Sequence, residues 1–192
     1  MKRLEIGEKQ DDLVRRLRRS DQRAFSEIFD ALHAPVLRYV QRILRDEDES
    51  YDVLQDVFAK LWEGRKNLKV HSSLKALIYR MARNRALNVL RKNDRMVAQS
   101  EIEAFPEVVD PSPSAETFYS VDQLSERITG WISALPPRRA EAFVLSRYHD
   151  LSAAEISHLM NLSRRTVETH ILHALRDLRA QLNTFESTDR ND

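Results

Sequence analysis

The segment from residue 151 to residue 178 places polar and basic side chains at the spacing of one helical face. In LSAAEISHLMNLSRRTVETHILHALRDL, apolar residues recur every three or four positions, which predicts two amphipathic helices joined by a three-residue turn. The inward stripe of the second helix comprises Val167, Ile171, Ala174, Leu175 and Leu178, which pack on Ile156 and Leu159 of the first. Its opposite face carries Arg165, Thr166, Thr169, His173 and Arg176.

A face of this kind is suited to DNA. Hydroxyl and imidazole groups can bond to base edges, flanking cations can pair with phosphates, and the major groove admits a helix. Ser163 stands where it can cap the second helix, whose free N–H groups favour an anion. The alternative is an ordinary helical hairpin with a solvated polar face, because this pattern also recurs by accident. The rest of the chain has to decide between the two.

The composition indicates an all-α protein. The chain has 192 residues, 42% of them hydrophobic, with three glycines and no cysteine, which leaves room for one large or two small domains. The lack of cysteine excludes a disulfide framework and thiolate zinc sites. Its charged N-terminus is unlike a signal peptide, and no apolar run approaches the roughly 20 residues that span a bilayer. We therefore expect a cytoplasmic protein without membrane insertion.

The formal net charge is only +1, but the charges are segregated along the chain. Residues 46–56 hold six acids and no Lys or Arg, whereas residues 65–95 hold ten cations and one acid. So basic a stretch is suited to the phosphates of a nucleic acid. Residues 98–126 hold seven acids, no Lys or Arg, and the run AFPEVVDPSPSAE. Its prolines and few large apolar side chains predict an extended linker between two domains.

Three amphipathic helices are predicted before this linker. Residues 24–44 form the first, which Pro35 either kinks or divides. Residues 51–62 form the second, with Val53, Leu54, Val57, Phe58, Leu61 and Trp62 inward and Asp52, Gln55, Asp56, Ala59 and Glu63 outward. The third, residues 73–91, buries Leu74, Leu77, Ile78, Met81 and Val89 and exposes Arg80, Arg83, Asn84 and Arg91. We expect a small three-helix bundle with an acidic ridge and a basic face.

Three stretches together resemble the sigma-70 family of bacterial RNA polymerase initiation factors, and specifically its extracytoplasmic-function (ECF) group. They are DVLQDVFAKLWE, SLKALIYRMARNRALNVLRK and ALPPRRAEAFVLSRYHDLSAAEISHLMNLSRRTVETHILHALRDLR, and the resemblance spans about residues 22–180. It implies a domain 2 at residues 22–96 and a domain 4 at residues 123–182, joined by an acidic linker at residues 97–122. Residues 1–21 would be a charged N-terminal segment and residues 183–192 a tail.

The resemblance also implies partners and roles. Asp52, Gln55, Asp56 and Glu63 would dock on the clamp helices of the polymerase β′ subunit, and domain 4 would lie near the β flap. The minus 10 element would be bound by Asn67, Lys69, His71, Ser72, Arg80, Arg83, Asn84 and Arg91, with the loop of residues 67–73 capturing a flipped base. The minus 35 element would be bound by Arg164, Arg165, Thr166, Glu168, Thr169, Leu172, His173 and Arg176. An anti-sigma partner is implied, whereas a cofactor, a metal, a small-molecule substrate and catalytic residues are not.

Several residues keep two interpretations. Tyr79 either stacks on a base or completes the core. Glu168 either accepts a hydrogen bond from a cytosine amino group or pairs with Arg164 or Arg165. His170 and His173 have a spacing that metal ligands can have, but no third ligand accompanies them, which favours a surface or DNA-facing position.

A different class of function is a helix-turn-helix regulator in which SRRTVETHI lies beneath a response-regulator receiver domain. The N-terminal half argues against it, because it lacks the alternating strands and the acidic pocket of a receiver. A nucleotide-dependent enzyme is disfavoured too, because Gly7, Gly64 and Gly130 are too far apart to form a phosphate loop. The charge pattern favours the sigma-factor interpretation.

Overall fold

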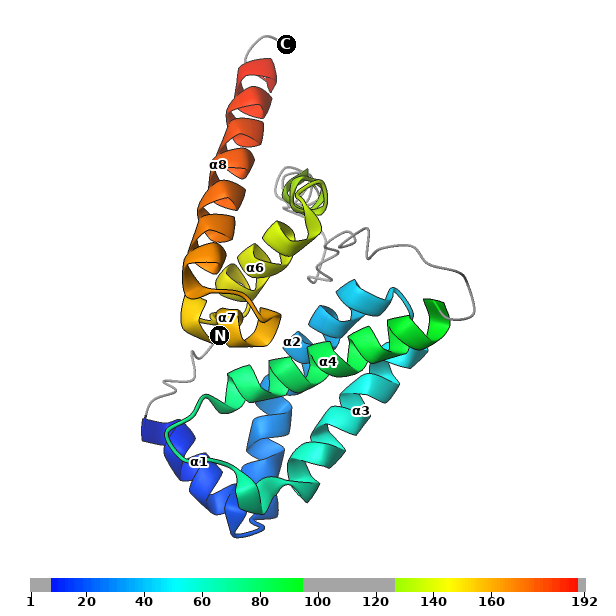
Figure 1. Ribbon diagram of the computed structural model, residues 1–192, viewed down its shortest axis with the longest axis vertical. Coiled ribbons are helices and arrows are strands. Elements are labelled where there is room, and N and C mark those ends of the chain that lie inside the picture. The colour runs from blue at the N-terminus through cyan, green and yellow to red at the C-terminus, as the bar shows by residue number, and fades with distance from the viewer. Residues whose placement is uncertain (1–7, 95–126, 190–192) are drawn as a thin grey trace, which may run out of the picture. The chain divides into compact units, whose positions relative to one another are not determined.

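The computed structural model describes residues 8–94 and 127–189, and within these ranges all regular structure is helical (Figure 1). The all-α fold class is thereby confirmed. The described residues form two compact units, an N-terminal unit before the gap and a C-terminal unit after it. The predicted linker at residues 97–122 lies outside the described residues. Within them, no helix is both long enough and apolar enough to cross a membrane.

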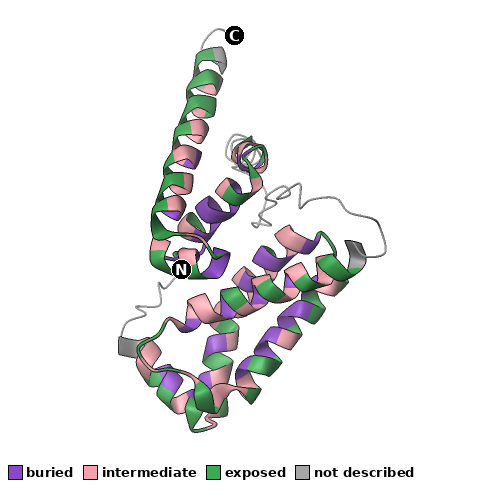
Figure 2. Cartoon of the chain, in the orientation of Figure 1, coloured by how far each residue is buried: buried purple, intermediate pink, exposed green. Residues whose placement is uncertain are grey.

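The N-terminal unit is a bundle built around one long helix. Its elements are α1 (Glu8–Arg18), α2 (Gln22–Leu44), α3 (Glu47–Glu63), the short 3-10 helix η1 (Arg65–Asn67) and α4 (Leu74–Asp94). Helix α2 packs against α1, α3 and α4, and α3 packs against α4. The inward faces meet in a core that includes Val36, Tyr39, Val40, Val53, Val57, Leu61, Ile78 and Tyr79 (Figure 2).

Helix α1 was not expected, because residues 1–21 were predicted to be a charged segment outside domain 2. Leu13, Val14 and Leu17 are buried, and α1 contacts both α2 and η1. These three residues form a narrow apolar stripe on one side of a helix whose other positions are mostly charged. The high charge of the segment concealed that stripe, so α1 belongs to the N-terminal unit.

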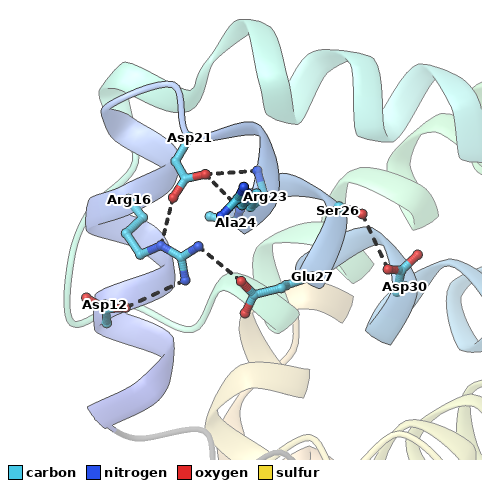
Figure 3. A network of polar contacts seen from close by, with 8 residues as sticks. All are labelled: Asp12, Arg16, Asp21, Arg23, Ala24, Ser26, Glu27 and Asp30. Atoms are coloured by element: carbon cyan, nitrogen blue, oxygen red, sulfur yellow. Dashed lines mark hydrogen bonds and ion pairs between the residues drawn. The ribbon is translucent and has the colours of Figure 1, made fainter.

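A network around Arg16 fixes α1 to the start of α2 (Figure 3). The Arg16 guanidinium donates to Asp21 at 2.8 Å and to Glu27 at 3.0 Å. Asp21 also caps α2 by accepting from the backbone N–H groups of Arg23 at 2.8 Å and Ala24 at 3.3 Å. Bonding from Arg16, together with the backbone N–H groups, lowers the pKa of Asp21. The network sets the direction in which α2 leaves α1.

Pro35 does not divide α2, which continues through it to Leu44. Proline removes one backbone N–H and normally kinks or breaks a helix. Here Val36, Tyr39 and Val40 follow it directly and are fully buried, so packing against three neighbouring helices offsets the lost hydrogen bond. Helix α3 begins before the predicted Tyr51, because Asp46 caps it by accepting from the Glu49 N–H at 2.8 Å.

The buried face of α4 also differs in part from the prediction. Leu74 and Ile78 are buried as expected, whereas Leu77, Met81 and Val89 are only half-buried. Ile78, Tyr79, Ala82 and Ala86 are fully buried, and the two alanines were not predicted to face inward. Helix α4 packs on both α2 and α3, and small alanine side chains allow it to approach two neighbours at once.

The C-terminal unit comprises a helical segment at residues 127–133, α6 (Pro137–Arg147), α7 (Ala153–Met160) and α8 (Arg164–Asp189). Its core cluster contains Ile132, Leu135, Ala140, Phe143, Val144 and Ala174. The predicted tail at residues 183–192 is not separate, because α8 continues to Asp189. Phe185 lies edge-on to Trp131, with ring centroids 6.2 Å apart, and the Arg127 guanidinium lies 4.5 Å from the Phe185 ring centroid. These contacts explain why the helix continues.

Candidate polymerase and promoter interfaces

Helices α7 and α8 form the predicted helix-turn-helix, with a turn of three residues from Asn161 to Ser163. Asn161 adopts a left-handed conformation with φ 55°, which asparagine tolerates better than most residues. The Leu162 N–H donates to the Ser157 carbonyl at 3.0 Å and closes the end of α7. A capping box of Ser152 and Glu155 begins α7. This capping box was not among the predicted features, although its S-x-x-E spacing is a readable signal.

Ser163 caps α8 as predicted. Its Oγ accepts from the Thr166 N–H at 3.0 Å and lies 2.7 Å from the Thr166 hydroxyl. Thr166 is half-buried, and its hydroxyl takes part in the cap. Thr166 was predicted to contact the minus 35 element, and in the structure its side chain takes part in the N-terminal cap of α8.

The outer face of α8 is a continuous exposed stripe. It consists of Arg165, Glu168, Thr169, Leu172 and Arg176, and Leu172 keeps 65% of its surface exposed. Val167 and Ala174 on the opposite side are fully buried. The Thr169 hydroxyl donates to the Arg165 carbonyl at 2.9 Å, which leaves its oxygen lone pairs as acceptors. Leu172 is a single apolar side chain within a polar stripe, which is ordinary on a protein surface.

Glu168 is paired with an arginine in the free protein. Arg164 Nε donates to Glu168 Oε1 at 2.8 Å, an ion pair one helical turn apart. In the described part of the chain, no carboxylate comes within 4 Å of Arg165. Without DNA, Glu168 therefore neutralises Arg164, and Arg165 is available to a phosphate.

A second set of charges lies where α8 meets α6, and Arg176 of the outer stripe reaches it. Arg139 of α6 pairs with Asp177 of α8, and the Arg176 guanidinium lies 3.4 Å from the same carboxylate. His170 is half-buried close to this set. Burial lowers the pKa of His170, and the positive charges of Arg139 and Arg138, with His173, lower it further. His170 thus belongs to the contact between α6 and α8 rather than to the outer stripe.

The acidic ridge lies on the outer side of α3. Asp52, Gln55 and Glu63 are exposed as predicted, and Tyr51, which was not singled out, keeps 44% of its surface exposed beside them. Asp56 differs, because its Oδ2 lies 2.5 Å from the Arg85 guanidinium of α4. Its side chain is 42% exposed, so the carboxylate serves the contact between α3 and α4 while still facing solvent.

The basic face lies on α4. Arg80, Asn84 and Arg91 are exposed and Arg83 is half-buried, while Arg91 donates to Asn88 at 3.3 Å. Tyr79 is fully buried, and its ring centroid lies 5.3 Å from that of Tyr39. Tyr79 therefore completes the core and does not stack on a base.

The loop between η1 and α4 presents Asn67, Lys69, His71 and Ser72, all exposed. Helix α1 contacts this loop. Gln10 Nε2 donates to the Ser72 carbonyl at 3.1 Å, and Asp11 accepts from the His71 N–H at 2.9 Å. Neither Gln10 nor Asp11 was predicted to be a site residue, because contacts between residues about 60 positions apart leave no local signal.

Family models match both units of the chain. A model described as sigma-70 region 2 matches residues 28–96, and one described as sigma-70 region 4 matches residues 125–178. The chain belongs to the sigma-70 family.

The curated relatives of this sigma factor are ECF sigma factors. The ECF RNA polymerase sigma factor SigK of Mycobacterium tuberculosis is 28% identical over 172 residues, and the alignment covers 88% of this chain and 91% of SigK. SigW of Bacillus subtilis is 26% identical over 176 residues, and the alignment covers 88% of this chain and 94% of SigW. Alignments that cover 88% of this chain extend over both of its units.

Solved structures support the fold of this sigma factor. CnrH, in a complex with the cytosolic domain of CnrY, aligns with a TM-score of 0.60 and 22% identity, over 91% of this chain and 97% of its own. The sigma factor RpoE of Bartonella quintana, in a complex with the anti-sigma factor NepR, aligns with a TM-score of 0.63 and 16% identity, over 83% of this chain and 96% of its own. At these identities the likeness establishes the all-α fold.

Proposed function

We propose that this ECF-type sigma factor binds core RNA polymerase through α3, holds the melted minus 10 strand with α4 and the preceding loop, and recognises the minus 35 element with α8. The observation that carries the proposal is the separation of an acidic ridge and a basic face within one small unit. The same observation includes the C-terminal unit, which contains a helix-turn-helix whose outer stripe carries Arg165 and Arg176. The polymerase makes the phosphodiester bonds, and the sigma factor performs no chemistry of its own.

The polymerase-binding ridge is formed by Asp52, Gln55, Asp56 and Glu63, with Tyr51 beside them. Exposed carboxylates of this kind favour the encounter with a basic surface and fix its orientation more than they add affinity. Tyr51 adds an amphipathic ring of the kind enriched where partners bind. We assign the β′ clamp helices as the partner of this ridge, and the β flap as the partner of the C-terminal unit.

Minus 10 recognition falls to two adjoining surfaces of the N-terminal unit. Extruding a base from the stack costs a few kcal/mol, which contacts to the flipped base and to the backbone must offset. Asn67, Lys69, His71 and Ser72 offer donors and acceptors in the exposed loop. Arg80, Arg83, Asn84 and Arg91 then line the helix that follows, where the adjoining phosphates would lie.

Minus 35 recognition falls to the outer stripe of α8. Arg165, Arg164 and Arg176 supply cations, whereas Thr169, His173 and Leu172 are placed to contact base edges or thymine methyl groups. Glu168 keeps two states, one paired with Arg164 and one free to accept from a cytosine amino group. Thr166 acts through the cap that orients the first turn.

A sigma factor that binds core polymerase must also be restrained when it is not needed. One solved structure of similar fold contains the sigma factor RpoE together with the anti-sigma factor NepR, and another contains CnrH with the cytosolic domain of CnrY. We propose an anti-sigma partner for this chain as well, and a cytoplasmic location where polymerase and promoter DNA are present.

Mixing the full chain with core bacterial RNA polymerase and a genomic promoter library, followed by sequencing of run-off transcripts, tests this function. We expect transcripts that share two elements upstream of their start sites, and co-elution of the chain with core enzyme. A chain that leaves core enzyme untouched but binds duplex DNA alone would instead be a self-sufficient helix-turn-helix regulator.

A further inference from the structure

The loop between η1 and α4 contains a strained residue. His71 has φ 65°, a left-handed conformation that residues other than glycine rarely adopt. Its ring is largely exposed, with 75% of the side-chain surface accessible, so packing of the ring does not impose this conformation. Backbone strain of this kind persists only where neighbouring groups hold it, and it concentrates at functional sites.

The group that holds His71 is the carboxylate of Asp11 on α1. Asp11 Oδ1 accepts from the His71 backbone N–H at 2.9 Å, and Asp11 Oδ2 lies 2.5 Å from His71 Nδ1. One carboxylate therefore contacts both the main chain and the ring of the same residue. The Asp11 side chain is only 16% exposed, so the contact is sheltered from solvent on the Asp11 side.

Neighbouring contacts make α1 a support for the whole loop. Gln10 donates to the Ser72 carbonyl at 3.1 Å and accepts from the Leu74 N–H at 3.3 Å. At the other end of α1, the Arg65 guanidinium of η1 donates to the Ser20 hydroxyl at 3.0 Å. Helix α1 thus contacts the chain on both sides of the loop, and Arg16 joins α1 to α2 (Figure 3).

We infer that Asp11 is a positioning residue for minus 10 recognition, which holds His71 in its left-handed conformation and so presents the loop in a form ready to receive a flipped base. The inference rests on the proposed function of this loop. A loop that is ordered before binding loses less conformational entropy when the strand arrives, so its affinity is higher. Without the carboxylate, only a fraction of the loops would be competent, and apparent affinity would fall by that fraction.

Asp11→Ala is the decisive variant, with Asp12→Ala as its matched control. Alanine preserves the helix, and Asp12 is the next residue of α1, with a side chain 63% exposed and 4.0 Å from Arg16. The probe is a fluorescein-labelled single-stranded oligonucleotide that carries the non-template minus 10 sequence of a promoter found in the run-off selection. We expect holoenzyme with Asp11→Ala to bind this oligonucleotide about tenfold more weakly, and the control to bind within twofold of the unsubstituted chain.

Two further variants separate positioning from a general effect of charge or stability. Asp11→Asn should bind nearly as well as the unsubstituted chain, because its amide can accept from the His71 N–H and donate to Nδ1 of the neutral ring. Asp11→Ala should weaken binding by less than twofold in a chain that already carries His71→Gly, since glycine adopts a positive φ without support. A further tenfold loss when Asp11→Ala is added to His71→Gly would overturn the inference.

Binding to core enzyme is measured first for every variant. If the unsubstituted chain does not bind core enzyme, the proposed function itself is wrong. If it does, and Asp11→Ala holds the oligonucleotide equally well, only the inference is wrong. A loss of core binding by Asp11→Ala would also overturn it, because the residue would then support the fold rather than the loop.

Discussion

At the scale of single residues, the ion pair between Arg164 and Glu168 neutralises part of the positive charge that α8 would present to DNA in our proposal. The two side chains are 71% and 51% exposed, and an exposed pair one helical turn apart contributes only about 0.3–0.5 kcal/mol. A phosphate that approaches Arg164 can therefore displace Glu168 at little cost. In our proposal, this weak pair tunes the affinity of α8 for DNA and contributes little to the stability of the helix.

Glu168→Ala should accordingly strengthen the binding of holoenzyme to any duplex and steepen its salt dependence by about one counterion, because Arg164 becomes available to a phosphate. Promoter and scrambled duplexes would be titrated by fluorescence anisotropy between about 50 and 200 mM salt. Removing Arg164 as well should return the slope to its original value. A loss confined to one promoter position would show instead that Glu168 contacts a base.

Substitutions of Arg165 and Thr169 should affect DNA binding in different ways, although the two residues lie one turn apart on the same stripe. Arg165→Ala should weaken binding to all duplexes and lower the salt slope by about 1, because phosphate contacts do not depend on sequence. Thr169→Ala should cost about 1–3 kcal/mol on the selected minus 35 site and little elsewhere. The same titrations measure both, and equal losses for Thr169→Ala on scrambled sites would contradict a contact with bases.

At the scale of elements, periodicity predicted the helices well because each one buries a broad apolar face. The helix-turn-helix, its cap at Ser163 and the ridge of α3 all follow from residues three and four apart. What periodicity missed depends on other elements. Helix α1 has too narrow a stripe, α2 continues through Pro35 because three helices surround it, and the pairing of Asp56 with Arg85 joins two helices.

In the candidate sites too, the sequence predicted what depends on one helix and did not predict what depends on contacts between helices. Side chains on a single exposed face, such as Asp52, Gln55, Arg80 and Arg165, were placed on the correct side of their helices. Residues that act across elements could not be found, because no local pattern links Asp11 to His71 or Arg139 to Asp177. The spacing of residues within one helix predicts which surface of that helix is exposed. Ion pairs with other helices decide which charged side chains on that surface are available to a partner.

The contact between α6 and α8 should make the C-terminal unit sensitive to acid. Its folded state disfavours the protonated form of His170, whose pKa is lowered by burial and by Arg139 and Arg138. The folded chain therefore binds fewer protons than the unfolded chain, and stability is present above the unfolded pKa of about 6.5 and lost as the pH falls below it.

Replacing His170 with Gln should flatten this pH dependence below about pH 6.5. Trp131 is the tryptophan of the C-terminal unit, so its fluorescence in a chain that also carries Trp62→Phe reports the unfolding of that unit. Thermal unfolding would be followed from pH 7.5 down to pH 5 with and without His170→Gln. Parallel curves for the two chains would contradict the assignment.

At the scale of the whole molecule, our proposal requires two faces of the N-terminal unit to bind two partners at once. The ridge on α3 faces the polymerase in our proposal, and the basic face on α4 holds the DNA strand. Asp56 and Arg85 connect them, because each belongs to one of these helices and their charged groups lie 2.5 Å apart. A substitution at Asp56 therefore disturbs a contact inside the unit as well as the surface offered to the polymerase.

Exchanging the two charges separates these effects. Asp56→Arg alone should abolish co-elution with core enzyme, both because it places a cation on the ridge and because it sets two cations against each other. Adding Arg85→Asp restores an ion pair between α3 and α4 but leaves the cation on the ridge. If the ridge binds the polymerase, the exchanged chain should be as stable as the original in thermal unfolding and should still fail to co-elute. Recovery of core binding in the exchanged chain would mean that Asp56 supports the bundle and that Asp52, Gln55 and Glu63 provide the contact without it.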